Sequence, residues 1–231
     1  CYDPAFAYEI AVIIQDGMRR MYQEGEEIFY YLTLYNENYP MPPMPQGVEE
    51  GIIKGLYKYQ PSAEKKKLKA NIFASGTIMN CALKAQEILA QRYNISADVW
   101  SATNYKQLRS EALRVKRWNM LHPEEKPKKS YIETILEKEK GPFVAVSDHI
   151  KAVPDQISQW VPGGLITLGT DGFGRSDTRE TLRRFFEVDA EFITLAVLYG
   201  LANRGEIPFS QVSKAIKDLG VNPEKAFAFC V

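Results

Sequence analysis

The chain of 231 residues has few of the side chains that most often build compact chemical sites. It contains three cysteines, Cys1, Cys81 and Cys230, and two histidines, His122 and His149. Three widely spaced cysteines are too few for a disulfide framework or a zinc site, so we predict no metal site and a reducing compartment, the cytoplasm.

An excess of charge and long apolar runs are also missing. Lys plus Arg and Asp plus Glu both number 29, which gives a formal net charge of zero. This balance argues against a nucleic-acid surface, which needs clustered basic residues, and the lysines at 65–69 are interpreted as a solvated loop. No apolar run approaches the roughly 18 residues that a membrane span requires, and we expect neither a membrane partner nor a signal peptide.

What is present is the composition of a globular domain, with 45% hydrophobic and 25% charged residues. Strands are predicted at 71–74, 97–102, 143–146 and 165–168. Helices are predicted at 78–89, 108–118, 131–138, 154–161, 177–186, 190–203 and 210–219. Strands that alternate with helices imply an α/β fold, with a mostly parallel sheet covered by helices on both faces.

The first part of the chain has a different pattern. Residues 8–22 carry one apolar helical face, and residues 28–34 read as a strand, a pair that cannot close a core alone. Four prolines between 40 and 45 predict an extended linker, which should keep this pair from folding back onto the α/β domain. We therefore expect three parts, 1–35, a linker with a short helix at 36–66, and the α/β domain at 67–231.

Residues 169–176 follow the last predicted strand and contain three glycines within six positions. This pattern predicts a tight turn in which Gly172 or Gly174 has positive φ. The helix that follows should be capped by Ser176 or Asp177, because short polar side chains accept hydrogen bonds from free N–H groups.

The same turn can also be interpreted as an anion or partner site, since a helix N-terminus presents free N–H groups. Its spacing matches neither a Walker loop nor a dinucleotide-binding turn. The residues that such a site would use are Gly172, Gly174, Arg175 and Ser176.

The residues from Gly169 to Arg179, Gly-Thr-Asp-Gly-Phe-Gly-Arg-Ser-Asp-Thr-Arg, resemble the C-terminal domain of the homodimeric bacterial pyruvate dehydrogenase E1 component. This family belongs to the transketolase-like group of thiamine-diphosphate enzymes. Similar segments occur in family order at 2–9, 36–39, 44–45, 47–55, 75–77, 117–123 and 204–207. Such an E1 is several times longer and only its last quarter matches, so we expect a fragment, in keeping with a first residue Cys1.

The resemblance implies oxidative decarboxylation of pyruvate, the product of glycolysis, with thiamine diphosphate and magnesium. It places the catalytic residues and the cofactor upstream of Cys1, so this segment would serve structure and dimer assembly and would be inactive alone. Residues 1–35 would be the end of the pyrimidine-binding middle domain. The implied partners are the remainder of E1, a second E1 subunit and the E2 dihydrolipoyl acetyltransferase, whose lipoyl group accepts the acetyl group.

The resemblance also suggests a substrate-channel lining of Tyr2, Asp3, Asn36 and Asn38, although local capping by Asp3 is an alternative. His149 follows a predicted strand and is the better placed histidine for acid–base chemistry, with a structural role as the alternative. Two other functions stay open. One is a stand-alone α/β module that binds a small anion at the turn 169–176, and the other is the equivalent part of another 2-oxo acid dehydrogenase or of a transketolase.

Overall fold

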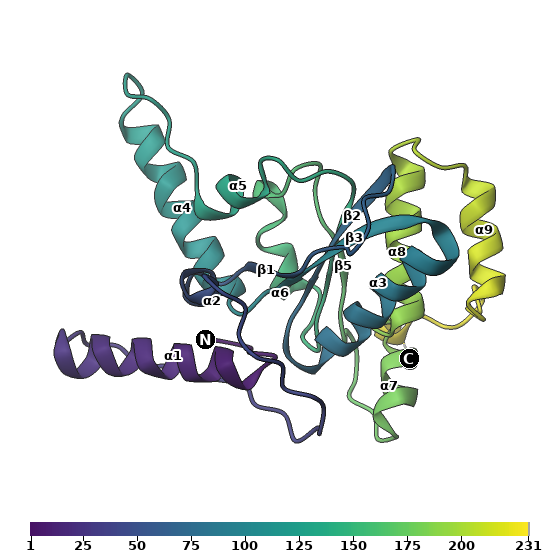
Figure 1. Cartoon of the computed structure of the whole chain (residues 1–231), viewed down its shortest axis with the longest axis horizontal. Helices are drawn as coiled ribbons and strands as arrows, with labels where there is room; N and C mark the ends of the chain where they lie inside the picture. Colours follow the sequence, from purple (N-terminus) through teal and green to yellow (C-terminus); the bar gives the residue numbers. More distant parts are fainter. Residues whose placement is uncertain (231) are drawn as a thin grey trace.

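The computed structural model describes residues 1–230, and its centre is a five-stranded sheet in the order β1-β3-β2-β4-β5 (Figure 1). The strands are β1 (Tyr57–Gln60), β2 (Leu68–Ala74), β3 (Ile95–Ser101), β4 (Phe143–Val146) and β5 (Ile166–Leu168). Strands β2 to β5 are parallel, and β1 runs antiparallel to β3 at one edge. The predicted mostly parallel sheet is confirmed.

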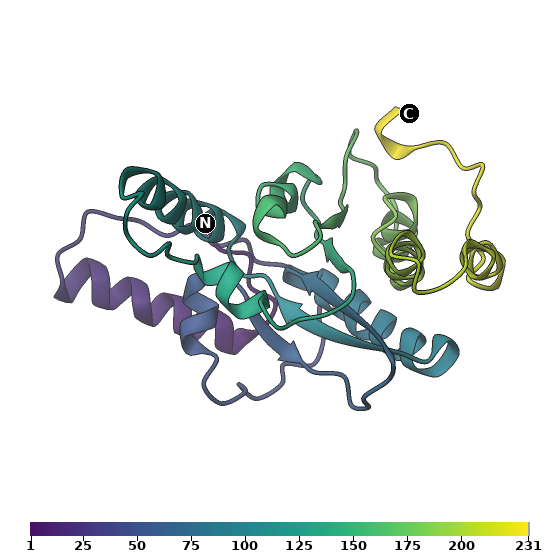
Figure 2. The same ribbon diagram turned by 90° about the horizontal axis from the view of Figure 1, so that it is seen from above.

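Helices cover both faces of the sheet because its central strands alternate buried side chains between two clusters. Ile72 of β2 packs with the helices of one face, and the next residue, Phe73, packs with those of the other. The first face carries α3 (Met79–Tyr93) and α8 (Ala190–Asn203), with α9 (Phe209–Asp218) beside α8, and the second carries α4 (Tyr105–Leu121), α5 (Tyr131–Leu136) and α6 (Ala152–Asp155). Figure 2 shows α8 and α9 side by side at the end of the molecule opposite α1. Among residues 1–230, no helix combines the length and apolar character needed to cross a membrane.

Strand β1 was not predicted from the sequence. It lies at the sheet edge, and its alternation of aromatic and polar residues, Tyr57-Lys58-Tyr59-Gln60, spans only four positions. Lys58 instead forms ion pairs with Asp98 of β3 at 2.6 Å and with Glu139 at 2.9 Å.

The N-terminal helix is present, but the strand predicted at 28–34 is wrong. Helix α1 (Ala7–Met18) continues as a π-helical turn, Arg19–Gln23. Residues 28–34 make a single β-bridge, between Leu32 and Tyr2, and Phe29 is 88% exposed. The backbone N–H and C=O groups of a strand require a neighbouring strand as hydrogen-bond partner. In residues 1–230, this segment pairs with another segment only at Tyr2.

The expectation that the first residues stay away from the α/β domain is also wrong. The Asp3 N–H donates to Thr103 O at 2.8 Å, and Ile13 of α1 is buried in a cluster with Ile52 of α2 (Glu49–Lys54). The prolines do extend the linker, but it returns to the sheet through α2. The opposite face of α1, which includes Met18, stays exposed.

The glycine turn after β5 is confirmed at Gly172, whose φ is +103°, whereas Gly174 does not have positive φ. The predicted cap is wrong by one residue. Helix α7 (Arg179–Phe185) is capped by Thr178, whose side chain accepts from the N–H of Thr181. Asp177 instead accepts from the N–H of the next residue, Thr178, at 2.7 Å.

Candidate functional site

The candidate site lies at the carboxyl edge of the sheet, where parallel strands of α/β folds present their ligand-binding loops. Thr77 follows β2, Asp148 and His149 follow β4, and Thr170 follows β5. The Thr170 hydroxyl donates to Asp148 O at 2.6 Å, which ties the last two loops together. Asp3 enters this edge from the N-terminal segment, because the Gly76 N–H donates to its carbonyl oxygen.

Asp3 is the most buried acid of this cluster, with 8% of its surface exposed. Its Oδ1 accepts hydrogen bonds from Thr33 at 2.5 Å and from Tyr35 at 2.7 Å, and its Oδ2 lies 3.4 Å from His149 Nε2. Burial acts to raise the pKa of Asp3, but these hydrogen-bonding groups, His149 foremost, outweigh it and lower the pKa. Asp3 in turn raises the pKa of His149.

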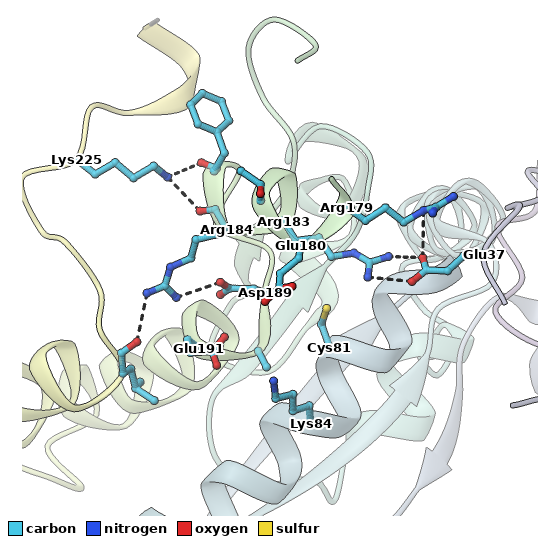
Figure 3. Close-up of a pocket in the computed structure, with 14 residues that line it drawn as sticks. Glu37, Cys81, Lys84, Arg179, Glu180, Arg183, Arg184, Asp189, Glu191 and Lys225 are labelled. Carbon is cyan, nitrogen blue, oxygen red and sulfur yellow. Dashed lines mark hydrogen bonds and ion pairs between the residues drawn. The ribbon is translucent and has the colours of Figure 1, made fainter. Parts of the chain in front are cut away.

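A second group of charges adjoins this pair. Arg183 of α7 holds both carboxylate oxygens of Glu37, at 2.5 and 3.2 Å, and also donates to the Thr77 hydroxyl at 3.2 Å. Figure 3 shows Arg179 and Arg183 both reaching Glu37. Burial raises the pKa of Asp148, whose Oδ2 accepts from Thr77 at 3.3 Å.

The structure brings one of the four predicted channel residues into this cluster, namely Asp3. Tyr2 is buried, stacks on Tyr30 with 5.7 Å between the ring centroids, and is therefore a packing residue here. Asn36 lies at the rim, where its side chain accepts from Arg179 at 2.6 Å. Asn38 is exposed on the surface.

The four residues predicted for an anion or partner site, Gly172, Gly174, Arg175 and Ser176, are all exposed. Gly174 and Arg175 line a cavity of about 320 Å³ that also borders Asp148. Gly172 instead approaches the C-terminal segment, since a Cβ there would lie 2.4 Å from Ala228 O.

A larger groove of about 1080 Å³ lies on the other side of α7, between α3 and the start of α8 (Figure 3). Some of its ionic groups are paired: Arg184 contacts Asp189 at 3.0 Å, and Lys225 lies 3.4 Å from Glu187. Cys81 lies in its wall, where burial raises the thiol pKa to about 11. The groove is larger than the cavity beside Asp148, and Arg179 and Arg183 line both.

The described residues contain no acidic cluster that could hold a magnesium ion by protein side chains alone. In residues 1–230 no three His, Cys, Asp or Glu side chains gather closely enough to hold a metal ion. Asp171, which stands before Gly172 as in a thiamine-diphosphate motif, lies 3.4 Å from the backbone N–H of Lys151 and 4.0 Å from its Nζ.

Glu37, Thr77, Asp148 and Arg183 were missed as site residues in the sequence. The available signal was position: Thr77 and Asp148 each follow a predicted strand, as His149 does. Glu37 and Arg183 carry no such signal, because their contact joins segments 146 residues apart.

A mainly parallel sheet, covered on both faces and with its polar cluster at the carboxyl edge, defines an α/β domain of the transketolase type. The family model for the transketolase-like C-terminal domain matches residues 55–189, and the chain belongs to this family. Residues 1–42 match the family model for the middle domain of the pyruvate dehydrogenase E1 component.

Curated relatives named pyruvate dehydrogenase E1 component match over 97% of the chain. One from Pseudomonas aeruginosa is 48% identical and one from Escherichia coli K12 is 46% identical. The chain spans only 26% and 25% of their lengths, about a quarter. A solved transketolase from Pichia stipitis, in complex with sedoheptulose-7-phosphate, matches 88% of the chain and 25% of its own with a TM-score of 0.56 at 18% identity, which supports the fold.

Proposed function

We propose that the chain works as the C-terminal quarter of a pyruvate dehydrogenase E1 component. The parent enzyme would decarboxylate pyruvate oxidatively and transfer the acetyl group to the lipoyl group of an E2 partner. The observation that carries this proposal is the 48% identity over 97% of the chain to a protein of that name.

In this proposal, thiamine diphosphate and magnesium are held by the remainder of E1. This segment would serve structure and dimer assembly in a cytoplasmic homodimer. Residues 1–35 would complete the middle domain, 36–66 would link, and 67–231 would form the C-terminal domain. The exposed apolar side chains Met18, Phe29, Tyr31 and Leu34 support a contact of the first part with further protein.

Asp3 and the rim residue Asn36 are proposed to shape the approach to the active site from this side. Asp3 is fixed by Thr33, Tyr35 and His149, so it would act by holding the cluster rather than by reacting. The chain alone is proposed to be inactive.

A chimera tests the proposed function. The 226 residues of the E. coli enzyme that match this chain at 46% identity are replaced by residues 1–231, and pyruvate-dependent reductive acetylation is measured with E. coli E2. We expect a thiamine-diphosphate-dependent activity within about tenfold of the parent, since the cofactor site would be untouched.

The matched control replaces the same residues by the C-terminal domain of a transketolase, which shares the fold and should not support activity. A folded, dimeric chimera without pyruvate-dependent turnover contradicts the proposal. Gain of ketol transfer between sugars would favour the transketolase alternative instead.

A further inference from the structure

We propose that the cavity of about 320 Å³ beside α7 binds a small organic anion, a phosphate or carboxylate group attached to an apolar body. We call it the arginine cavity, because Arg175, Arg179 and Arg183 line it together with Asp148. This proposal does not depend on the parent enzyme's activity and does not use the N-terminus of α7.

The positive charges of the arginine cavity exceed the negative ones. Three guanidinium groups face two carboxylates, those of Asp148 and, behind Arg183, Glu37. An anion therefore gains more from these charges than a cation would.

The guanidinium groups retain donors that the protein does not use. In residues 1–230, Arg175 makes no hydrogen bond or ion pair, and it lies over the Phe185 ring with 5.1 Å to the centroid. Arg179 hydrogen-bonds Asn36 through Nη2, and its Nε lies 3.7 Å from Glu37 Oε2, so its Nη1 is left without a partner among these residues. Both terminal nitrogens of Arg183 already donate to Glu37 or Thr77, so this side chain forms a fixed wall of the cavity.

The remaining lining of the cavity includes both polar and apolar side chains. Hydroxyl groups come from Tyr35, Thr77 and Thr170, and apolar surface comes from Leu182, Phe186 and Val188. A volume of this size is at the lower end of that of ligand sites, so a single ring or a short chain fits beside one anionic group.

Titration calorimetry on the 231-residue chain tests the proposal with phenyl phosphate, benzoate and inorganic phosphate. We expect phenyl phosphate or benzoate to bind at least about tenfold more tightly than inorganic phosphate, because only the organic probes reach the apolar wall. The order of phenyl phosphate and benzoate identifies the preferred anionic group.

Two variants and a matched control locate the binding. Arg175→Ala should weaken the tighter probe about tenfold, because one charge-assisted hydrogen bond is lost, and Gly174→Asp should weaken it further by adding a negative charge at the rim. Gly174 has open space for a side chain, so the second change should not disturb the fold. Arg114→Ala removes the same charge from the exposed side of α4 and should leave the affinity unchanged.

Three results would overturn the proposal. The first is that neither organic probe binds saturably below about 10 mM. The second is that all three probes bind with equal affinity. The third is that Arg175→Ala and Arg114→Ala weaken the binding equally. Circular dichroism of each variant verifies that the fold is retained.

Discussion

Ser101, the last residue of β3, donates a hydrogen bond of 2.6 Å to the carboxylate of Glu9 in α1, although the two lie 92 positions apart. Tyr57 of β1 donates to the same oxygen at 2.6 Å, and the other oxygen accepts from the N–H groups of Ala5 and Phe6. Glu9 is fully buried, and burial raises its pKa despite these four hydrogen bonds. One carboxylate thus joins the first helix to two strands of the sheet.

We expect Glu9→Ala to lower the free energy of unfolding by about 3 kcal/mol or more, because it leaves buried donors without partners. Glu9→Gln should cost less, since its amide oxygen can still accept from the backbone and its NH₂ can donate to the hydroxyls. Urea unfolding followed by circular dichroism measures both. Glu87→Ala, an exposed change on α3, is the control and should have little effect. Equal free energies of unfolding for Glu9→Ala and Glu87→Ala would show that the buried carboxylate does not stabilise the fold.

The Asp3–His149 pair predicts a pH dependence of stability. Because the folded-state pKa of His149 is raised, its contribution is fully present below the unfolded value, about 6.5, and is lost as pH rises through the folded value. Asp3, whose pKa is lowered, stays ionised throughout this window. The free energy of unfolding should therefore fall as pH rises from about 6.5 through the raised folded-state pKa of His149.

The same titration with His149→Gln should be flatter. His122→Gln is the matched control, since His122 stacks on Trp118 with 4.4 Å between the ring centroids, away from Asp3, and it should retain the slope. A slope that persists in His149→Gln and disappears in His122→Gln would refute the assignment.

The glycine turn predicts a contrast between two neighbouring positions. Gly172→Ala should cost more than about 1 kcal/mol, because an L residue at a φ of +103° is strained and its Cβ would lie 2.4 Å from Ala228 O. Gly174→Ala should be close to neutral, since no atom lies within 4 Å of a Cβ there. Thermal unfolding compares the two, and equal melting temperatures would remove the strain argument.

Limited proteolysis distinguishes the buried from the exposed part of the first 35 residues. Chymotrypsin should cut first after Tyr22, Phe29 or Tyr31, which are exposed in a segment with little backbone pairing. The fragment that begins at Cys1 and contains Phe6 and Ile13 should stay bound to the domain, because both side chains are buried. Mass spectrometry after gel filtration measures this, and prompt release of that fragment would contradict the packing of α1.

The sequence predicts most of the α/β fold because buried parallel strands carry continuous apolar runs. Strand β4 is predicted to the residue, and Gly172 is predicted by the geometry of its turn. The strand predicted at 28–34 was wrong. Its apolar and aromatic residues indicate that the segment is buried, but they do not show that the covering residues belong to the same chain. The cap at Thr178 was missed because three successive polar residues can each cap a helix, and only the backbone angles choose among them.

The position of the candidate site could be predicted from the sequence, but the set of residues that form it could not. Asp3 and His149 were singled out separately, from the N-terminal segment and from the end of a strand. Their pairing depends on how residues 1–6 cross the sheet edge, which no local pattern encodes. The contact of Arg183 with Glu37 likewise arises only when α7 and the linker are both in place.

The crossing of residues 3–9 over the sheet edge limits how relatives can exchange parts. Family similarity draws a boundary at residue 55, yet the acceptor for Ser101 and the partner for His149 come from before it. A recombinant joined at residue 55 would inherit Ser101 from one parent and Glu9 from the other, so this hydrogen bond would form only where the two parents supply a matching donor and acceptor. We therefore expect residues 1–9 and the sheet to be inherited together, as one unit that is larger than the segment matched by either family model.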